Sequence, residues 1–152
     1  MNVTLTDKVS IKKARAKDLP YIYSLYQEEI PTSSWTLEDF HEFSTQKYND
    51  IFSITLGKVC VGFIMLTSII PESDLINIAI QKPLQNIGIG GKAIQELFTL
   101  LQKRGVANIY LEVRKSSQAL NFYVSHGFQI TAYRKKYYAD NEDAVLMERQ
   151  LV

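Results

Sequence analysis

The sequence predicts an α/β fold: one domain, residues 1–152, with a mixed, partly antiparallel sheet flanked by helices. Segments at helical spacing alternate along the chain with short apolar or two-residue-periodic segments typical of strands. No linker, repeat or low-complexity stretch divides the chain, and its 46% hydrophobic content is ordinary for a soluble globular protein. The expected order is strand, two helices, three strands, helix, strand, helix and two strands.

The N-terminal part is expected to contain one strand and two helices. Val9 and Ile11 alternate with polar residues, as in a strand. Asp18 suits the N-cap of a helix that runs to Ile30. The letters TLED, starting at Thr36, resemble a capping box that opens a second helix.

Three strands should follow these helices. Residues 51–56 and 59–67 are strand-like, and Gly57 followed by Lys58 suits a tight turn between them. The apolar segment LINIAI, residues 75–80, predicts the third strand.

The C-terminal half is expected to hold two helices and three strands. After a glycine-rich segment, a helix presents Ala93, Ile94, Leu97, Phe98 and Leu101 on one face and ends at Gly105. The remaining elements are a strand over 107–113, a helix over 117–126 closed by Gly127, and a hairpin of 128–138 with 144–152.

Composition excludes several classes of protein. The formal net charge of +1 argues against a nucleic-acid binder that neutralises many phosphates. The longest uncharged apolar run, residues 59–71, is too short to cross a bilayer, and the first ten residues contain no apolar signal segment. Cys60 is the only cysteine, so we expect no internal disulfide and a cytoplasmic location. Because His41 has no partner at metal-ligand spacing, we expect no metal.

The segment LQNIGIGGKAIQELF, residues 84–98, places glycines at the start of a helix. A Walker phosphate loop would need serine or threonine after Lys92, where Ala93 stands. Gly88 and Gly90 fit the loose dinucleotide pattern, but the letters QKPLQNI separate them from the preceding strand. A third alternative is a glycine-rich turn without a ligand. The fourth is a cradle in which unpaired backbone N–H groups at the helix start bind a pyrophosphate.

Read as Gln85-x-x-Gly88-x-Gly90, this segment resembles the coenzyme A loop of the GCN5-related N-acetyltransferases, the GNAT family. The segments LINIAI, GVANIYLEVR, NFYVSHGF, KKYY and NEDAVLM, in this order, resemble the RimI branch, whose members acetylate the N-terminal alanine of a bacterial ribosomal protein. The resemblance implies acetyl-CoA as cosubstrate and a protein N-terminus, that of a small-subunit ribosomal protein, as partner. Three alternatives remain open: a lysine acceptor, a small amine acceptor, and an inactive acetyl-CoA-binding module.

The resemblance also implies a cofactor site at the end of one strand and along the loop. Two departures from the family pattern concern this site. Asn86, Ile87 and Gly91 stand where arginine or lysine is common, and Ser117 stands near the position of a cofactor-binding asparagine. The implied cofactor residues are Ile78, Ala79, Ile80, Gln85, Asn86, Ile87, Gly88, Ile89, Gly90, Gly91, Lys92 and Ser117.

Glu112 is the candidate general base. In the strand IYLEVR the apolar residues share one face, so Tyr110, Glu112 and Arg114 project from the other. One interpretation is an ion pair with Arg114. The resemblance instead implies that Glu112 accepts the amine's proton, acting through water.

Tyr123 is the candidate general acid, because the resemblance places it where the family's tyrosine protonates the coenzyme thiolate. By spacing alone it is a core residue of its helix. The nearby His126 precedes a helix-ending glycine, where a cation interacts favourably with the helix dipole, so we assign it a structural role.

The acceptor site is less specified by the sequence. By resemblance, Trp35, Tyr137 and Tyr138 line the acceptor groove, and core packing is the alternative for each. Residues 134–136, RKK, suit a solvated strand face or contact with an acidic partner. An α-amine is roughly a tenth unprotonated at pH 7 and a lysine amine under about a thousandth, which favours an N-terminal acceptor.

Overall fold

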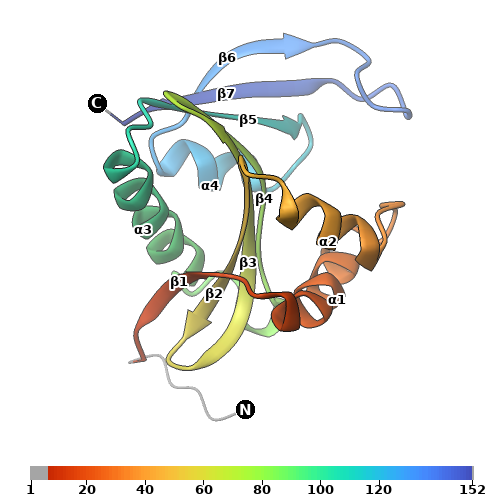
Figure 1. The fold of residues 1–152 in the computed structure, drawn as a ribbon. Coiled ribbons are helices and arrows are strands. Elements are labelled where there is room, and N and C mark those ends of the chain that lie inside the picture. Colours follow the sequence, from red (N-terminus) through yellow and green to blue (C-terminus); the bar gives the residue numbers. More distant parts are fainter. Residues whose placement is uncertain (1–6, 152) are drawn as a thin grey trace.

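The structure is a computed structural model that describes residues 7–151. Seven strands form one sheet in the order β1-β2-β3-β4-β5-β7-β6, and β4–β5 is its one parallel pair. The expected element order is confirmed (Figure 1). Its elements are β1 Val9–Lys13, α1 Leu19–Glu29, α2 Leu37–Thr45, β2 Asn49–Leu56, β3 Val59–Ile69, β4 Glu72–Ile80, α3 Ile89–Lys103, β5 Asn108–Arg114, α4 Ala119–Ser125, β6 Gln129–Arg134 and β7 Ala144–Gln150.

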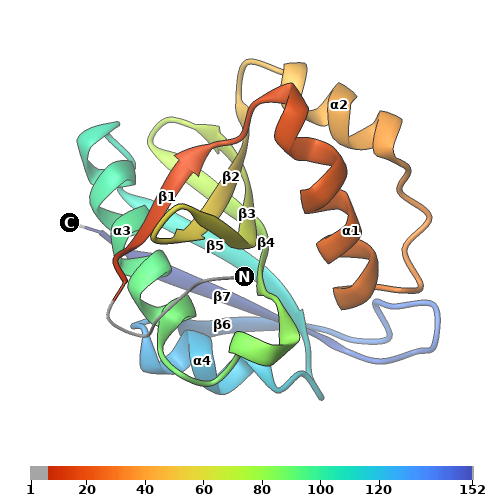
Figure 2. The ribbon, with the colours of Figure 1, turned by 90° about the horizontal axis from the view of Figure 1, so that it is seen from below.

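Helices cover both faces of the sheet. Helices α1 and α2 lie on one face, and α3 and α4 lie on the other (Figures 1 and 2). Each pair encloses its own apolar cluster, and strand β2, which lies between β1 and β3, is buried along its whole length. The face of α3 expected from its spacing is the buried one. The sheet therefore supports a separate core on each side.

Local sequence signals explain most of the boundaries. Thr36 Oγ1 accepts the backbone N–H of Asp39 at 3.2 Å, and the Asp39 carboxylate accepts that of Thr36 at 2.7 Å, which confirms the capping box. Gly57, with φ of 62°, begins the tight turn between β2 and β3. Gly105 and Gly127 end α3 and α4 with positive φ.

Three expectations about the elements need correction. The Asp18 side chain does not cap α1, because its carboxylate accepts the backbone N–H of Arg15 at 2.8 Å and closes a short 3-10 turn instead. β4 begins three residues earlier than expected, and α4 is shorter at both ends. Val152, the expected end of the last strand, lies outside the described residues.

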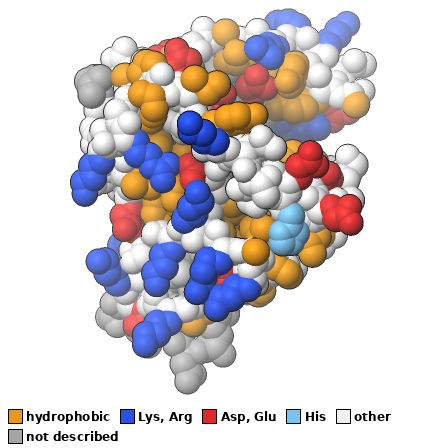
Figure 3. All heavy atoms as spheres, in the orientation of Figure 1, with side chains coloured by type: hydrophobic (Ala, Val, Ile, Leu, Met, Phe, Trp, Pro, Cys, Tyr) orange, Lys and Arg blue, Asp and Glu red, His pale blue; other side chains and the backbone are white. Residues whose placement is uncertain are grey.

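Charge is unevenly spread in spite of the nearly neutral total. In the view of Figure 3, lysine and arginine side chains gather over α3 and β1, whereas acidic side chains lie around α2. No helix within residues 7–151 is both long and apolar enough to span a bilayer.

The parallel pair β4–β5 positions the site. Only Glu72–Asp74 of β4 pairs with Asn108–Tyr110 of β5, and beyond these residues the two strands diverge (Figure 1). From there β4 continues beside β3, while β5 continues beside β7. The strands therefore form a V whose opening exposes the end of β4 to α3 and α4.

Candidate active site

A cavity of about 920 Å³ lies beside the diverging end of β4. Its walls come from β4, the loop that follows, the first turns of α3, and α4. Nine of the expected cofactor residues line it: Ile78, Ala79, Ile80, Gln85, Asn86, Gly88, Gly90, Gly91 and Lys92. The volume is within the usual range for small-molecule sites.

Three expected cofactor residues do not line this cavity. Ile89 is buried in the core, and Ile87 is exposed. Ser117 Oγ accepts the backbone N–H of Ala119 at 3.1 Å at the start of α4. In this structure Ser117 therefore makes a local side-chain-to-backbone turn just before α4, whose N-cap is Gln118.

The loop is tied to the strand that precedes it. Gln85 Nε2 donates a hydrogen bond of 2.7 Å to the carbonyl oxygen of Ile80, the last residue of β4. Among the glycines at the helix start only Gly88 has a positive φ, 95°, and a Cβ atom there would meet nothing within 4 Å. A Cβ at Gly90 would make ordinary contact with the Phe122 ring. Gly88 thus serves the backbone turn and leaves open space above it.

The start of α3 suits an anion. The first N–H groups of a helix have no acceptor within it, and the helix dipole places partial positive charge there. Lys92 adds a cation that lines the same cavity. These groups are of the kind that bind phosphates at helix N-termini.

Tyr123 is both a core residue and a cavity residue. It is 9% exposed, and its ring makes edge contacts with Phe122 and Phe128 at centroid distances of 5.5 and 5.6 Å. Burial, with a smaller contribution from the negative charge of Glu29, raises the pKa of Tyr123 to about 12. The phenol is therefore protonated at neutral pH and able to donate a proton.

Glu112 projects from β5 on the face expected, but its surroundings differ. Its side chain is 37% exposed. Arg134 Nη1 lies 3.2 Å from Glu112 Oε1, which replaces the ion pair with Arg114 that spacing suggested. The reason is tertiary: β7 lies between β5 and β6 in the sheet, and the hairpin directs Arg134 of β6 back to Glu112.

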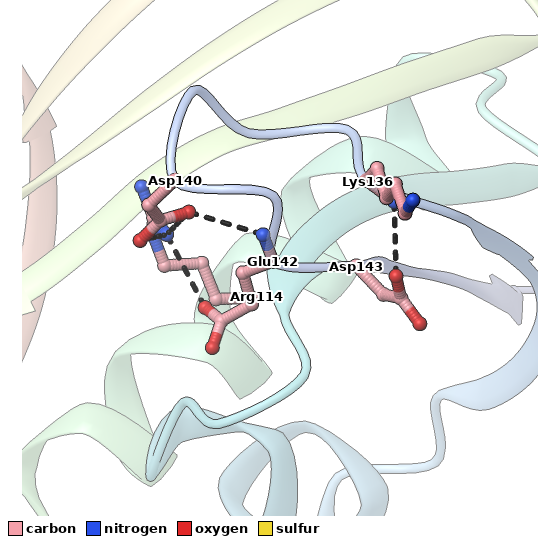
Figure 4. A network of polar contacts seen from close by, with 5 residues as sticks. All are labelled: Arg114, Lys136, Asp140, Glu142 and Asp143. Carbon is pink, nitrogen blue, oxygen red and sulfur yellow. Dashed lines mark hydrogen bonds and ion pairs between the residues drawn. The ribbon is translucent and has the colours of Figure 1, made fainter.

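Arg114 belongs to a polar network that holds the loop between β6 and β7. Its Nη1 donates to Asp140 Oδ2 at 2.9 Å and to Glu142 Oε1 at 3.2 Å (Figure 4). Asp143 accepts the backbone N–H of Lys136 at 2.9 Å in the same loop. The guanidinium of Arg114 also lies 4.0 Å from the ring centroid of Tyr138. The network therefore positions the aromatic segment at residues 137–138.

A second cavity, of about 940 Å³, contains Glu112. The three expected acceptor residues, Trp35, Tyr137 and Tyr138, all line it. Trp35 also packs among the aromatic rings of α1 and α2, so this residue contributes to the core and lines the cavity as well. The structure thus brings together the candidate base and the acceptor residues, but it places Tyr123 in the first cavity, so acid and base line separate cavities.

Sequence reasoning missed several residues that line the cavities. Glu29, at the end of α1, lines the first cavity, as does His126 at the end of α4. Asp74 and Arg134 line the second. For His126 the adjacent NFYVSHGF motif was a usable signal, whereas nothing local marked Glu29 or Asp74. No group of three or more potential metal ligands occurs within residues 7–151.

Comparison with known proteins identifies the family. The sequence profile of the Acetyltransferase (GNAT) family matches residues 19–128. The chain belongs to the GNAT acetyltransferase family. This family membership confirms the resemblance seen in the loop and strand motifs, and acetyl-CoA is the cosubstrate of the GNAT family.

Similar GNAT proteins include ribosomal-protein-modifying enzymes. The chain is 30% identical over 142 residues to the [ribosomal protein bS18]-alanine N-acetyltransferase of Escherichia coli, covering 91% of this chain and 95% of the relative. The enzyme of that name from Haemophilus influenzae is also 30% identical, over 143 residues, covering 90% of this chain and 95% of the relative.

Solved GNAT structures share the fold. The ribosomal-protein-S18-alanine N-acetyltransferase from E. coli superposes with a TM-score of 0.82 at 29% identity, covering 95% of this chain and 94% of that one. A GNAT family acetyltransferase from Elizabethkingia anophelis with acetyl-CoA bound superposes with a TM-score of 0.78 at 22% identity, covering 95% of this chain and 99% of that one.

The raised pKa of Tyr123 predicts a specific loss of stability in alkali. Because the folded state favours the neutral phenol, this contribution is complete below pH 10 and is lost as pH rises toward 12. Between pH 8 and pH 11 the wild type should lose about 1 kcal/mol more unfolding free energy than Tyr123→Phe. Urea denaturation at both pH values measures this. Tyr133→Phe, at an exposed tyrosine, is the control and should lose as much as the wild type.

Proposed function

We propose that this GNAT protein is an N-α-acetyltransferase that acetylates the N-terminal amine of a protein, the N-terminal alanine of a small-subunit ribosomal protein. The main support is the similarity, over nine-tenths of the chain, to enzymes named for that reaction. A structural feature also supports it, because the cavity that contains Glu112 is lined by the aromatic side chains of Trp35, Tyr137 and Tyr138. We further propose that residues 1–152 form one domain and act in the cytoplasm.

The first cavity fits acetyl-CoA. The space above Gly88 is open, unpaired N–H groups begin α3, and Lys92 lies beside them. The loop from Gln85 to Lys92 would hold the pyrophosphate, and the edge of β4 at residues 78–80 would hold the adjoining arm. When bound, acetyl-CoA supplies the acetyl group as a thioester.

The proton transfers are assigned to two side chains. Glu112 accepts a proton from the acceptor amine nitrogen through a water molecule, which leaves the amine neutral for attack on the carbonyl carbon. As the carbon–sulfur bond breaks, Tyr123 would donate its hydroxyl proton to the departing sulfur, while the nitrogen of the new amide releases its second proton to solvent and the Tyr123 phenolate regains a proton from solvent. A buried phenol retains its proton for this step, because its pKa lies well above neutral pH.

An α-amine suits such a base better than a lysine amine does. The α-amine has a pKa near 8 and the lysine amine one near 10.4, so Glu112 would have to deprotonate a far larger fraction of a lysine acceptor. The flanking rings of Trp35, Tyr137 and Tyr138 would contact the first residues of an extended peptide.

Acetyl transfer to a panel of acceptors tests the proposal. The purified protein is incubated with acetyl-CoA and peptides that begin with alanine, the same peptides with blocked N-termini and an internal lysine, and small amines. We expect kcat/KM for the alanine peptides to exceed the others by at least about tenfold. A preference for lysine or a small amine would replace the proposed acceptor, and CoA binding without any transfer would indicate a binding module.

Replacement of Glu112 tests the base. Glu112→Gln keeps the shape but cannot hold a proton, so turnover at neutral pH should fall about 10²- to 10⁴-fold with normal acetyl-CoA binding. The deficit should shrink as pH rises, because more of the acceptor amine is then already neutral. A pH-rate profile on an alanine peptide measures both effects.

The control for this variant is Glu148→Gln, a carboxylate of β7 that faces Tyr110 in the sheet and lies outside the groove. Glu148→Gln should have the same pH-rate profile as the wild type. If Glu112→Gln instead gives a profile parallel to the wild type with a lower melting temperature, Glu112 is a structural partner of Arg134 alone.

Replacement of Tyr123 tests the acid. Tyr123→Phe retains the ring contacts with Phe122 and Phe128, and we expect it to bind acetyl-CoA while turnover falls about a hundredfold or more. Tyr133→Phe again serves as the control. Wild-type turnover in Tyr123→Phe would return this tyrosine to a purely structural role.

A further inference from the structure

His126 lies in the cofactor cavity rather than only at a helix end. It follows the last residue of α4, where spacing gave it a role in helix termination. The structure adds that its side chain lines the same cavity as the glycine loop and Lys92. It is half-buried there. A helix-end role alone does not require the imidazole to face this cavity.

Three contacts fix the orientation of the imidazole. Its ring lies 4.7 Å from the Phe122 ring, centroid to centroid. Gln95 Nε2 lies 3.5 Å from Nδ1, a contact in which Nδ1 accepts when the ring carries its proton on Nε2. The edge formed by Cε1 and Nε2 is turned toward Gly91.

Gly91 allows this close approach. A Cβ atom at Gly91 would lie 3.0 Å from His126 Cε1 and 3.1 Å from Nε2, tighter than side chains normally pack. The absence of a side chain thus places an N–H donor against the first turn of α3, beside the backbone groups that would bind phosphate. The same first turn provides Lys92.

Other charged and titratable groups surround this part of the cavity. Lys92 and Glu96 of α3 and Tyr123 of α4 line the cavity, and Glu29 of α1 lies on it as well. Arg149 of β7 lies behind Gly127, the residue after His126. An imidazole that takes up a second proton becomes a cation with two N–H donors.

We propose that His126 binds a phosphate oxygen of coenzyme A through Nε2, and that its protonation strengthens this contact. The assignment rests on the proposed cofactor cavity. A neutral imidazole donates one hydrogen bond to the phosphate, whereas the imidazolium donates a charge-assisted one, which is roughly twice as strong. His126 therefore contributes more to cofactor affinity at pH 6 than at pH 8.

Calorimetric titration with free coenzyme A at pH 6 and pH 8 tests this assignment. His126→Phe keeps the aromatic packing and removes the donor, whereas His126→Gln keeps a donor that does not titrate. The measured quantity is the ratio of wild-type to variant affinity. The phosphate monoester of the ligand itself changes charge near pH 6, and this effect cancels in the ratio unless the monoester is the group that His126 contacts, a case that dephospho-coenzyme A separates.

We expect His126→Phe to bind coenzyme A about tenfold more weakly than the wild type at pH 6 and about threefold more weakly at pH 8. His126→Gln should match the wild type at pH 8 within about threefold and fall behind at pH 6. His41→Gln is the matched control, because the chain has two histidines and His41 lies on α2, outside the cavity. The ratio of wild-type to His41→Gln affinity for coenzyme A should stay near one at both pH values.

Titration with dephospho-coenzyme A identifies the phosphate. If the ratio of wild-type to His126→Phe affinity is the same for dephospho-coenzyme A as for coenzyme A, the contact is with the pyrophosphate. If the ratio falls to one, the contact is with the 3′-phosphate. Both results support the proposal. Ratios near one for both His126 variants, with a changed melting temperature or without, overturn it and leave the helix-end role. Failure of the wild type to bind coenzyme A would overturn the cofactor cavity itself, a distinct result.

Discussion

The three-residue parallel pairing between β4 and β5 is the constraint on which the site depends. Beyond Asp74 and Tyr110 the strands no longer share hydrogen bonds, because each follows its antiparallel neighbour into a different part of the sheet. The end of β4 is thereby freed for the cavity and for the loop that opens α3. Had the pairing continued to Ile80, backbone groups of β4 would have been used within the sheet.

The same divergence explains why the candidate acid and base come from different sides. Tyr123 belongs to α4, which covers one face of the sheet (Figure 2). Glu112 alternates along β5 with Ile109 and Leu111, which are buried on that face, and so projects from the opposite one. A reaction between two substrates suits this arrangement, since each can enter through its own cavity. Tyr123 also shows that one side chain can pack in the core and line a cavity.

Features encoded by neighbouring residues could be predicted from the sequence. The capping box at Thr36, the turn at Gly57 and the alternating faces of β5 each depend on a few adjacent positions, and the structure contains all three. The ion pair of Glu112 with Arg134 could not be predicted, because the two residues are 22 positions apart and meet only through the sheet order. The cavity position of Glu29 likewise depends on where α1 ends relative to the sheet.

The network around Arg114 gives the two cavities unequal sensitivity to ionic strength. The loop at residues 140–143 is held by ion pairs and hydrogen bonds in which at least one partner of each pair is well exposed, and dissolved ions screen such attractions. The cofactor cavity is instead held by buried apolar contacts and a side-chain bond to the backbone. A high salt concentration therefore increases the mobility of the cavity wall around Tyr138 first, while the loop at Gly88 keeps its conformation.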